Sequence, residues 1–166
     1  MPTVAPLTSD DTELIIALAS IIWHQHYSHI ISPEQIEYML NQRYSATLIQ
    51  TQIRSDHTWW KKLVLDKQII GFSCCIRTDN PKELKLDKLY LHPHHQRKGY
   101  GAMLVENIKQ FMHDRSFEQL ILTVNKNNTV AIAAYLRYGF TISDDIIIDI
   151  GHGFVMDDYL MTMPVK

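Results

Sequence analysis

The amino-acid sequence predicts one domain over residues 1–166, of the α+β or mixed α/β class, with helices packed around one sheet. Three observations support this prediction. The chain has 166 residues, which is the usual length of a single domain. Its residues are 46% hydrophobic and 20% charged, a balance typical of a packed interior rather than of disorder. Segments with helical spacing come first and later alternate with apolar runs typical of strands.

Helices are expected in the first third of the chain. Capping residue types precede apolar residues at helical spacing over 14–27. Ser32 at an N-cap and Pro33 in a first turn predict a second helix that continues through Leu40. A further helical piece covers 46–53. The opening residues before the first helix are too short to assign.

The pattern changes at Trp59, where apolar runs replace helical spacing. The runs at 59–65 and 68–77, joined by a polar turn, predict an antiparallel hairpin. Alternating leucines predict a strand over 83–91, and a polar loop follows it. The remaining expected elements are a helix at 103–112, a strand at 120–124, a helix at 129–138 ended by Gly139, and strands at 140–150 and 154–163.

Charge, cysteines and hydropathy exclude several classes of protein. The formal net charge is −2, so no overall basic field indicates nucleic acid or an anionic membrane as a partner. Cys74 and Cys75 are neighbours on an expected strand and point to opposite faces, which argues against a disulfide. No apolar run approaches the roughly 20 residues of a membrane helix, and the first residues do not resemble a signal peptide. We therefore expect a cytoplasmic protein.

The most informative segment joins the strand at 83–91 to the next helix through a short basic loop. The first turn of a helix has unpaired N–H groups and the positive end of the helix dipole, so it can bind phosphate. Glycine at 99 and 101 lets the backbone approach a ligand closely. The residues expected around a phosphate are Arg97, Lys98, Gly99, Tyr100, Gly101 and Ala102. Two other nucleotide-binding patterns, G-x-x-x-x-G-K-[ST] and G-x-G-x-x-G, are absent.

Two motifs carry a family resemblance. Residues 96–102 resemble the Q/R-x-x-G-x-G/A signature of the GNAT superfamily of acetyl-CoA-dependent N-acetyltransferases. Farther along the chain, the family's N-x-x-A-x-x-x-Y followed by GF is matched by Asn128, Ala131, Tyr135, Gly139 and Phe140. The resemblance implies a central, mostly antiparallel sheet that splays open and is flanked by helices. It also implies acetyl-CoA as cofactor and suggests a homodimer.

The resemblance also implies roles for individual residues. The exposed backbone of the central strand would pair with pantetheine, the glycine loop would hold the pyrophosphate, and Tyr135 would protonate the departing thiolate. Packing in the core is the alternative role for this tyrosine. The implied cofactor-binding residues are Leu89, Tyr90, Leu91, Gln96, Arg97, Lys98, Gly99, Tyr100, Gly101, Ala102, Asn128 and Tyr135.

Acetyl transfer also needs a base, because an alkyl ammonium has a pKa of about 10.4 and attacks only when neutral. Many family members place a carboxylate where this chain has Lys85. Glu83 and Asp87 share a strand face with Lys85, so either could accept the proton directly or through water. A solvated strand face is the equally simple alternative for both.

The first two helices would cover the acceptor side, which makes His26, Tyr27 and Tyr38 candidates for the acceptor pocket, with ordinary packing as the alternative. Asp157 and Asp158 could attract a cationic amine, although acidic pairs beside a turn are usually only solvated. No metal site is expected, because the histidines in 24–29 and 92–95 lack ligand spacing.

These features favour an enzyme that transfers acetyl directly to an amine in a ternary complex. Cys74 and Cys75 have no histidine partner in the pattern, which disfavours a covalent acetyl-enzyme. The W-x-x-x-Y of Trp23 and Tyr27, with the segment 32–40, resembles one branch of bacterial small-amine acetyltransferases. The acceptor expected from this branch resemblance is a small amine or a polyamine. Two alternatives stay open at this point: a peptide or protein N-terminal acetyltransferase, and a non-catalytic acyl-CoA-binding sensor module.

Overall fold

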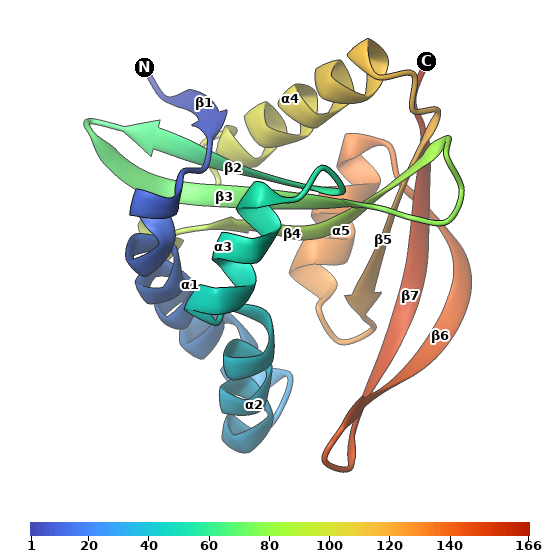
Figure 1. Ribbon diagram of the computed structural model, residues 1–166. Helices are drawn as coiled ribbons and strands as arrows, with labels where there is room; N and C mark the ends of the chain where they lie inside the picture. Colours follow the sequence, from blue (N-terminus) through green and yellow to red (C-terminus); the bar gives the residue numbers. More distant parts are fainter.

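Residues 1–166 are described by a computed structural model, which has one seven-stranded sheet with helices on both faces (Figure 1). The strands are β1 (Thr3–Pro6), β2 (Thr58–Leu65), β3 (Gln68–Arg77), β4 (Glu83–Leu91), β5 (Gln119–Asn125), β6 (Thr141–Gly151) and β7 (Phe154–Pro164). The helices are α1 (Thr12–His26), α2 (Pro33–Arg43), α3 (Ala46–Arg54), α4 (Tyr100–Asp114) and α5 (Thr129–Tyr138). The sheet order is β1-β2-β3-β4-β5-β7-β6. Only β4 and β5 pair in parallel, so the mixed, mostly antiparallel class expected from the sequence is confirmed.

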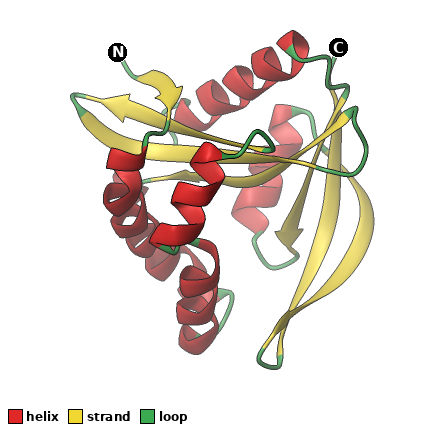
Figure 2. Ribbon diagram, viewed as in Figure 1, coloured by secondary structure: helices red, strands yellow, loops and turns green.

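Helices cover both faces of the sheet (Figure 2), and a large hydrophobic core lies on each face, with a smaller one around Leu63, Ile70 and Leu104. One large core is built from α1, α2 and α3 against β2 and β3, and includes Trp23 and Phe72. The other large core is built from α4 against β4, β5 and β7, and includes Leu84 and Met161. No helix is long and apolar enough to cross a membrane.

Local signals in the sequence explain most helix starts. The Ser32 hydroxyl accepts a hydrogen bond from the Gln35 N–H at 3.1 Å, which caps the first turn of α2. Asn128 caps α5, and Gly139 ends it with a φ of 109°. The opening residues form the edge strand β1, which pairs with β2. That pairing joins segments about sixty residues apart, so no local pattern could reveal it.

The central strands separate after a short common stretch. Only three residue pairs join β4 to β5, beginning at Glu83 with Gln119 and ending at Lys85 with Ile121. Beyond Lys85 the two strands diverge, and the edge of β4 that faces β5 is unpaired over 86–91. The splayed sheet implied by the family resemblance is therefore present.

A β-bulge lies in β4 just beyond this separation. Cys74 pairs with Lys88 and Cys75 pairs with Leu86, so Asp87 is the extra residue on β4. Leu86 belongs to the core under α4, whereas the Lys88 ammonium lies against aromatic rings on the opposite face. The bulge thus brings the Asp87 and Lys88 side chains to one face, where they form an ion pair of 2.6 Å.

Candidate active site

A cavity of about 990 Å³ opens where β4 and β5 separate. Its walls come from α1, α2, β4, β5, α5, β6, β7 and the loop before α4. The residues of its lining that the sequence singled out are His26, Tyr27, Asp87, Leu89, Tyr90, Leu91, Gln96, Arg97, Gly99, Gly101, Ala102, Asn128, Tyr135 and Asp158. The splayed sheet therefore gathers most of the expected site into one space.

The N-terminus of α4 opens into this cavity without a cap. No side chain caps the helix at Gly99, whose φ of 82° is left-handed. The first N–H paired inside the helix is that of Met103, which donates to the Gly99 carbonyl at 3.3 Å. The N–H groups of the three preceding residues are left for a ligand, beside the Arg97 side chain in the lining. These residues suit a phosphate group.

Gly101 leaves room for the hydroxyl group of a neighbouring tyrosine. A Cβ atom at this position would lie 2.5 Å from the Tyr138 hydroxyl oxygen, far closer than any van der Waals contact. Tyr138 comes from α5 and also lines the cavity. The glycine therefore lets α5 and the start of α4 approach each other where the phosphate would bind.

Two expected loop residues lie outside the cavity. The exposed Lys98 is not part of the lining, and Tyr100 packs beside the small core around Leu104. The left-handed turn at Arg97 and Gly99 directs alternate residues of the loop away from the cavity. Neither side chain therefore reaches the cavity, and a contact of Tyr100 with the cofactor would be made through its backbone N–H.

Asn128 is held from two sides. Its Oδ1 accepts hydrogen bonds from the Ala131 N–H at 3.3 Å and from the His26 Nε2 at 2.9 Å. The second bond joins the last residue of α1 to the N-cap of α5 across the cavity. It fixes the amide of Asn128, so that the side-chain NH₂ group is available to a ligand.

Three tyrosines face one another inside the cavity. The Tyr27 and Tyr90 hydroxyl groups lie 3.0 Å apart. Tyr135, on α5, also lines the cavity, and its ring centre lies 5.6 Å from that of Phe140. Burial raises the pKa of Tyr135 well above its usual value. Tyr135 therefore keeps its proton at neutral pH and can donate it.

Asp87 is surrounded by cations. Its carboxylate lies 2.6 Å from the Lys88 Nζ, 3.3 Å from an Arg43 Nη and 4.0 Å from the Lys85 Nζ. Burial alone would raise the pKa of Asp87, but the charges of Arg43 and Lys88 outweigh it and lower the pKa to about 2. A carboxylate held so firmly in the charged form is a poor base.

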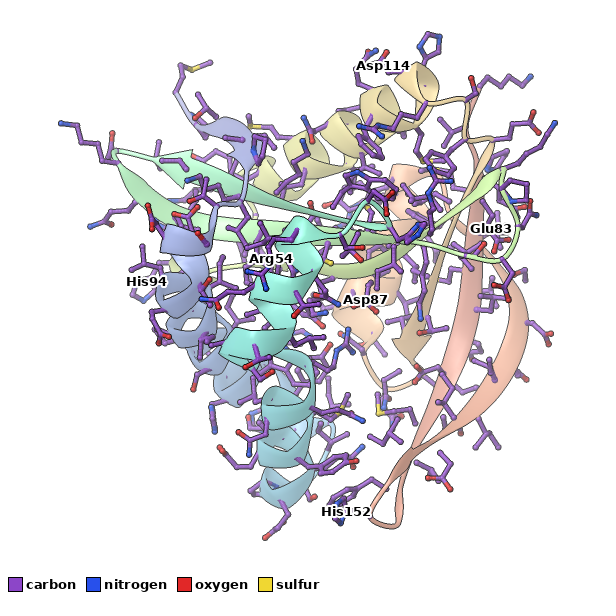
Figure 3. All side chains as sticks on the ribbon, viewed as in Figure 1. Arg54, Glu83, Asp87, His94, Asp114 and His152 are labelled. Atoms are coloured by element: carbon purple, nitrogen blue, oxygen red, sulfur yellow. The ribbon has the colours of Figure 1, made fainter.

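Glu83 is the first residue of β4 and lies well apart from Asp87 (Figure 3). It is not part of the cavity lining. Four residues of strand span about 13 Å, which separates Glu83 from Asp87. Neither residue expected as a base is well placed for that role, Glu83 because it lies outside the cavity lining and Asp87 because of its ion pairs.

Asp158 on β7 has the properties that Asp87 lacks. It is 4% exposed, lines the cavity, and its Oδ1 has no hydrogen-bond partner in the protein. Burial and the neighbouring Asp157 raise the pKa of Asp158 to about 6, and Arg43 only partly offsets this. The sequence left two alternatives for Asp157 and Asp158, attraction of a cationic amine or a solvated acidic pair, and did not indicate that Asp158 is buried. Its burial depends on the pairing of β5 with β7, where Asp158 faces Asn125.

Tyr38, expected in the acceptor pocket, lies outside the lining. Its hydroxyl donates a 2.6 Å hydrogen bond to the Ile150 carbonyl, and its ring packs against His152 and Phe154. Tyr38 therefore fixes the turn of the β6–β7 hairpin to α2, which agrees with the packing alternative for this residue.

Comparison with known protein families identifies the class of protein that has this fold and cavity. Residues 15–140 match the acetyltransferase (GNAT) family, and the chain belongs to it. The resemblance drawn from the two motifs is confirmed, as is the expected class of enzyme; acetyl-CoA is the acetyl donor in this family.

Individual relatives cover nearly the whole chain. Over 158 residues it is 27% identical to the spermidine N(1)-acetyltransferase of Thermoplasma acidophilum, covering 93% of this chain and 94% of that protein. The crystal structure of the PaiA N-acetyltransferase of Thermoplasma acidophilum in complex with coenzyme A has a TM-score of 0.87 at 24% identity, covering 99% of both chains. The ribosomal-protein-S18-alanine N-acetyltransferase of Escherichia coli has a TM-score of 0.75 at 18% identity, covering 100% of this chain and 95% of that one.

Proposed function

We propose that this protein transfers the acetyl group of acetyl-CoA directly to a primary amine while both are bound. One observation carries the proposal. The unpaired edge of β4, the uncapped N-terminus of α4 and the Tyr135 side chain meet in a single cavity. Acetyl-CoA supplies an acyl thioester that an amine can attack. Such a ligand needs backbone partners for its amides, a cradle for its pyrophosphate and a proton donor for its sulfur.

The residues of the cavity match these needs in turn. The edge of β4 that β5 leaves unpaired beyond Lys85 offers strand-like hydrogen bonds to the amides of pantetheine. Gly99, Gly101 and Ala102 surround the N–H groups of the α4 terminus, and Arg97 adds a positive charge. The Asn128 amide, fixed by His26, completes the set from the opposite wall.

Asp158 and Tyr135 divide the proton transfers between them. Asp158 accepts one proton from the acceptor's ammonium, because its carboxylate is buried, unpaired and ionised at neutral pH. The neutral nitrogen forms a bond to the thioester carbon as the carbon–sulfur bond breaks. Tyr135 gives its proton to the sulfur and recovers one from the new amide nitrogen. The products are the acetylated amine, the thiol and one released proton.

The acceptor is a small primary amine or a polyamine. Two findings favour this class: the similarity to the spermidine N(1)-acetyltransferase, and the buried carboxylate of Asp158 in the cavity. The cytoplasmic location and the homodimer expected from the sequence stay predictions.

Binding of acetyl-CoA is tested first, by calorimetry on the wild type and two matched variants. Gly99→Asp places a carboxylate at the expected pyrophosphate site, whereas Gly153→Asp places one in the β6–β7 turn. Both glycines have left-handed φ values, 82° and 77°, and neither has an atom within 4 Å of an added Cβ. The backbone strain is therefore matched. Gly99→Asp is expected to weaken binding at least tenfold and Gly153→Asp to leave it unchanged; equal affinities would contradict the assignment.

Acetyl transfer is then measured with a pooled panel of polyamines, amino acids, aminoglycosides and short peptides, with products identified by mass. An acetylated small amine or polyamine is the expected product. A peptide acetylated at its N-terminus in place of these would identify the alternative enzyme class. Binding of acetyl-CoA without any product would instead support the sensor alternative and contradict the proposed transfer.

A further inference from the structure

The acceptor end of the cavity has more positive than negative side chains, which does not favour a polycation as the acceptor. Three cations line it, Arg43, Lys85 and Lys88, against the carboxylates of Asp87 and Asp158. From this arrangement, and resting on the proposed function, we infer that the acceptor is an amine that also carries a carboxylate, with its ammonium at Asp158 and its carboxylate at Lys85. A polyamine would place a second positive charge near Lys85.

Two of the three cations are already committed to the protein. The side chain of Lys88 is 2% exposed, pairs with Asp87 at 2.6 Å, and lies 5.0 Å from the Trp60 ring centre. Arg43 donates a 2.9 Å hydrogen bond to the Asp87 carbonyl and pairs with its carboxylate at 3.3 Å. Because one carboxylate, that of Asp87, pairs with both Arg43 and Lys88, it neutralises their two positive charges only in part. Neither cation is free to turn toward a ligand.

Lys85 differs from both. Its Nζ lies 4.0 Å from the Asp87 Oδ1, beyond hydrogen-bond distance, and its side chain is 37% exposed. Lys85 therefore has ammonium donors that no protein group uses, at the edge of the cavity where β4 leaves β5. A carboxylate is the natural partner for such a group.

Asp158 provides the complementary end. Its Oδ1 is buried without a hydrogen-bond partner, a costly state that an ammonium would relieve. The nearby Lys126 does not serve it, because Lys126 pairs with Asp157 at 2.9 Å and with Asp145 at 3.7 Å. Lys85 and Asp158 form no ion pair with each other. The acceptor end of the cavity thus offers the Lys85 ammonium, held only by its long 4.0 Å ion pair with Asp87, and the unpartnered Asp158 Oδ1, and a zwitterionic acceptor can bind both.

The test compares amine acceptors that differ in whether they carry a carboxylate. With acetyl-CoA saturating, kcat/KM is measured for lysine, for cadaverine, which lacks the carboxylate, and for lysinamide, in which an uncharged amide replaces it. Spermidine is the polyamine reference. We expect kcat/KM for lysine to exceed that for cadaverine and lysinamide by about tenfold, the value of one good ion pair. Higher values for cadaverine or spermidine would overturn the inference without touching the proposed acetyl transfer.

Variants identify the residue responsible. Lys85→Gln is expected to lower kcat/KM for lysine about tenfold, mainly through a higher KM, and to change kcat/KM for cadaverine by less than twofold. Lys85→Glu should reverse the preference, so that kcat/KM becomes higher for cadaverine than for lysine. The control is Lys82→Gln, since Lys82 pairs with Glu118 on the surface, outside the cavity lining. An equal loss for lysine and cadaverine in Lys85→Gln would show that Lys85 does not bind the carboxylate.

Equilibrium binding separates this inference from the proposed function. If no amine is acetylated, the proposed transfer fails, and calorimetry on the protein saturated with coenzyme A still compares lysine with cadaverine. Tighter binding of lysine, lost in Lys85→Gln, would support the zwitterion site. Equal binding of the two amines would overturn it.

Discussion

The imidazole of His26 and the amide of Asn128 are joined by a hydrogen bond of 2.9 Å, although 102 residues separate them in the chain. His26 is the last residue of α1 and Asn128 is the N-cap of α5, so the bond joins these two helices across the cavity. It links the wall proposed for the acceptor to the side chain proposed to bind the cofactor.

Removal of this bond should weaken cofactor binding. His26→Ala leaves the Asn128 amide held only by the Ala131 N–H. A hydrogen bond of this kind contributes about 1 kcal/mol, so the Kd for coenzyme A should rise roughly fivefold, as measured by calorimetry. His29→Ala, at an exposed position just beyond α1, is the control. Equal Kd values for the two variants would show that His26 does not position Asn128.

The contact between Gly101 and Tyr138 predicts a rescue. Gly101→Ala puts a Cβ 2.5 Å from the Tyr138 hydroxyl oxygen and should destabilise the protein by about 1–3 kcal/mol. Tyr138→Phe in the same chain removes that oxygen and should recover most of the loss, because the next ring atom is 3.6 Å away. Denaturant unfolding measures both. Additive losses in the double variant would mean that the two residues do not clash.

Tyr135→Phe should lower kcat by at least about 100-fold while leaving the Kd for acetyl-CoA nearly unchanged. The ring stays in place against Phe140, and only the proton donor to the sulfur is lost. Stopped-flow assay of thiol release measures the rate. Tyr159→Phe on β7, outside the lining, is the matched control. If Tyr135→Phe turned over like that control, Tyr135 would not be the acid.

The pKa of Asp158, raised to about 6 by burial and by Asp157, predicts the acid limb of the pH profile. Only the ionised carboxylate accepts a proton, so kcat/KM should fall about tenfold per pH unit below 6. Asp158→Asn should remove the inflection and lower kcat/KM about 100-fold. Asp157→Asn should move the inflection to lower pH, because one of the charges that raise the pKa is gone. An unchanged inflection in Asp158→Asn would assign it to another group.

Asp87 contributes to stability rather than to proton transfer. Asp87→Asn leaves Arg43 and Lys88 without their shared anion and should cost about 3–5 kcal/mol of unfolding free energy. Since the folded pKa is lowered from 3.8 to about 2, the stabilisation is present above pH 3.8 and is lost as pH falls toward 2. Denaturant unfolding between pH 7 and pH 2 measures it. If the free energies of unfolding of the wild type and of Asp87→Asn differed as much at pH 2 as at pH 7, this account would be contradicted.

The sequence predicted the elements that local patterns determine. The strands at 68–77 and 83–91 and the helix at 129–138 have the bounds expected from periodicity and capping. The two motifs also indicated the α4 terminus, Asn128 and Tyr135, all of which line the cavity, because short spacings fix these residues relative to one another.

The charged part of the site could not be predicted in the same way. Asp87 and Lys88 share a face only because of the bulge opposite Cys74 and Cys75, which strand periodicity does not reveal. Asp158 is buried by strand pairing between distant segments. Arg43 reaches Asp87 from the end of α2, 44 residues away along the chain. The pKa values that separate a base from a structural carboxylate depend on these long-range contacts.

The central claim is that acetyl passes directly from the cofactor to the amine within the cavity between β4 and β5. The most direct test is a single turnover with isotopically labelled acetyl-CoA, in which the masses of the intact protein and of the amine are followed together. We predict that the protein stays unlabelled with or without amine, and that label appears in the amine as acetyl-CoA is consumed. A labelled protein that forms without amine and then passes its acetyl group on would contradict the account.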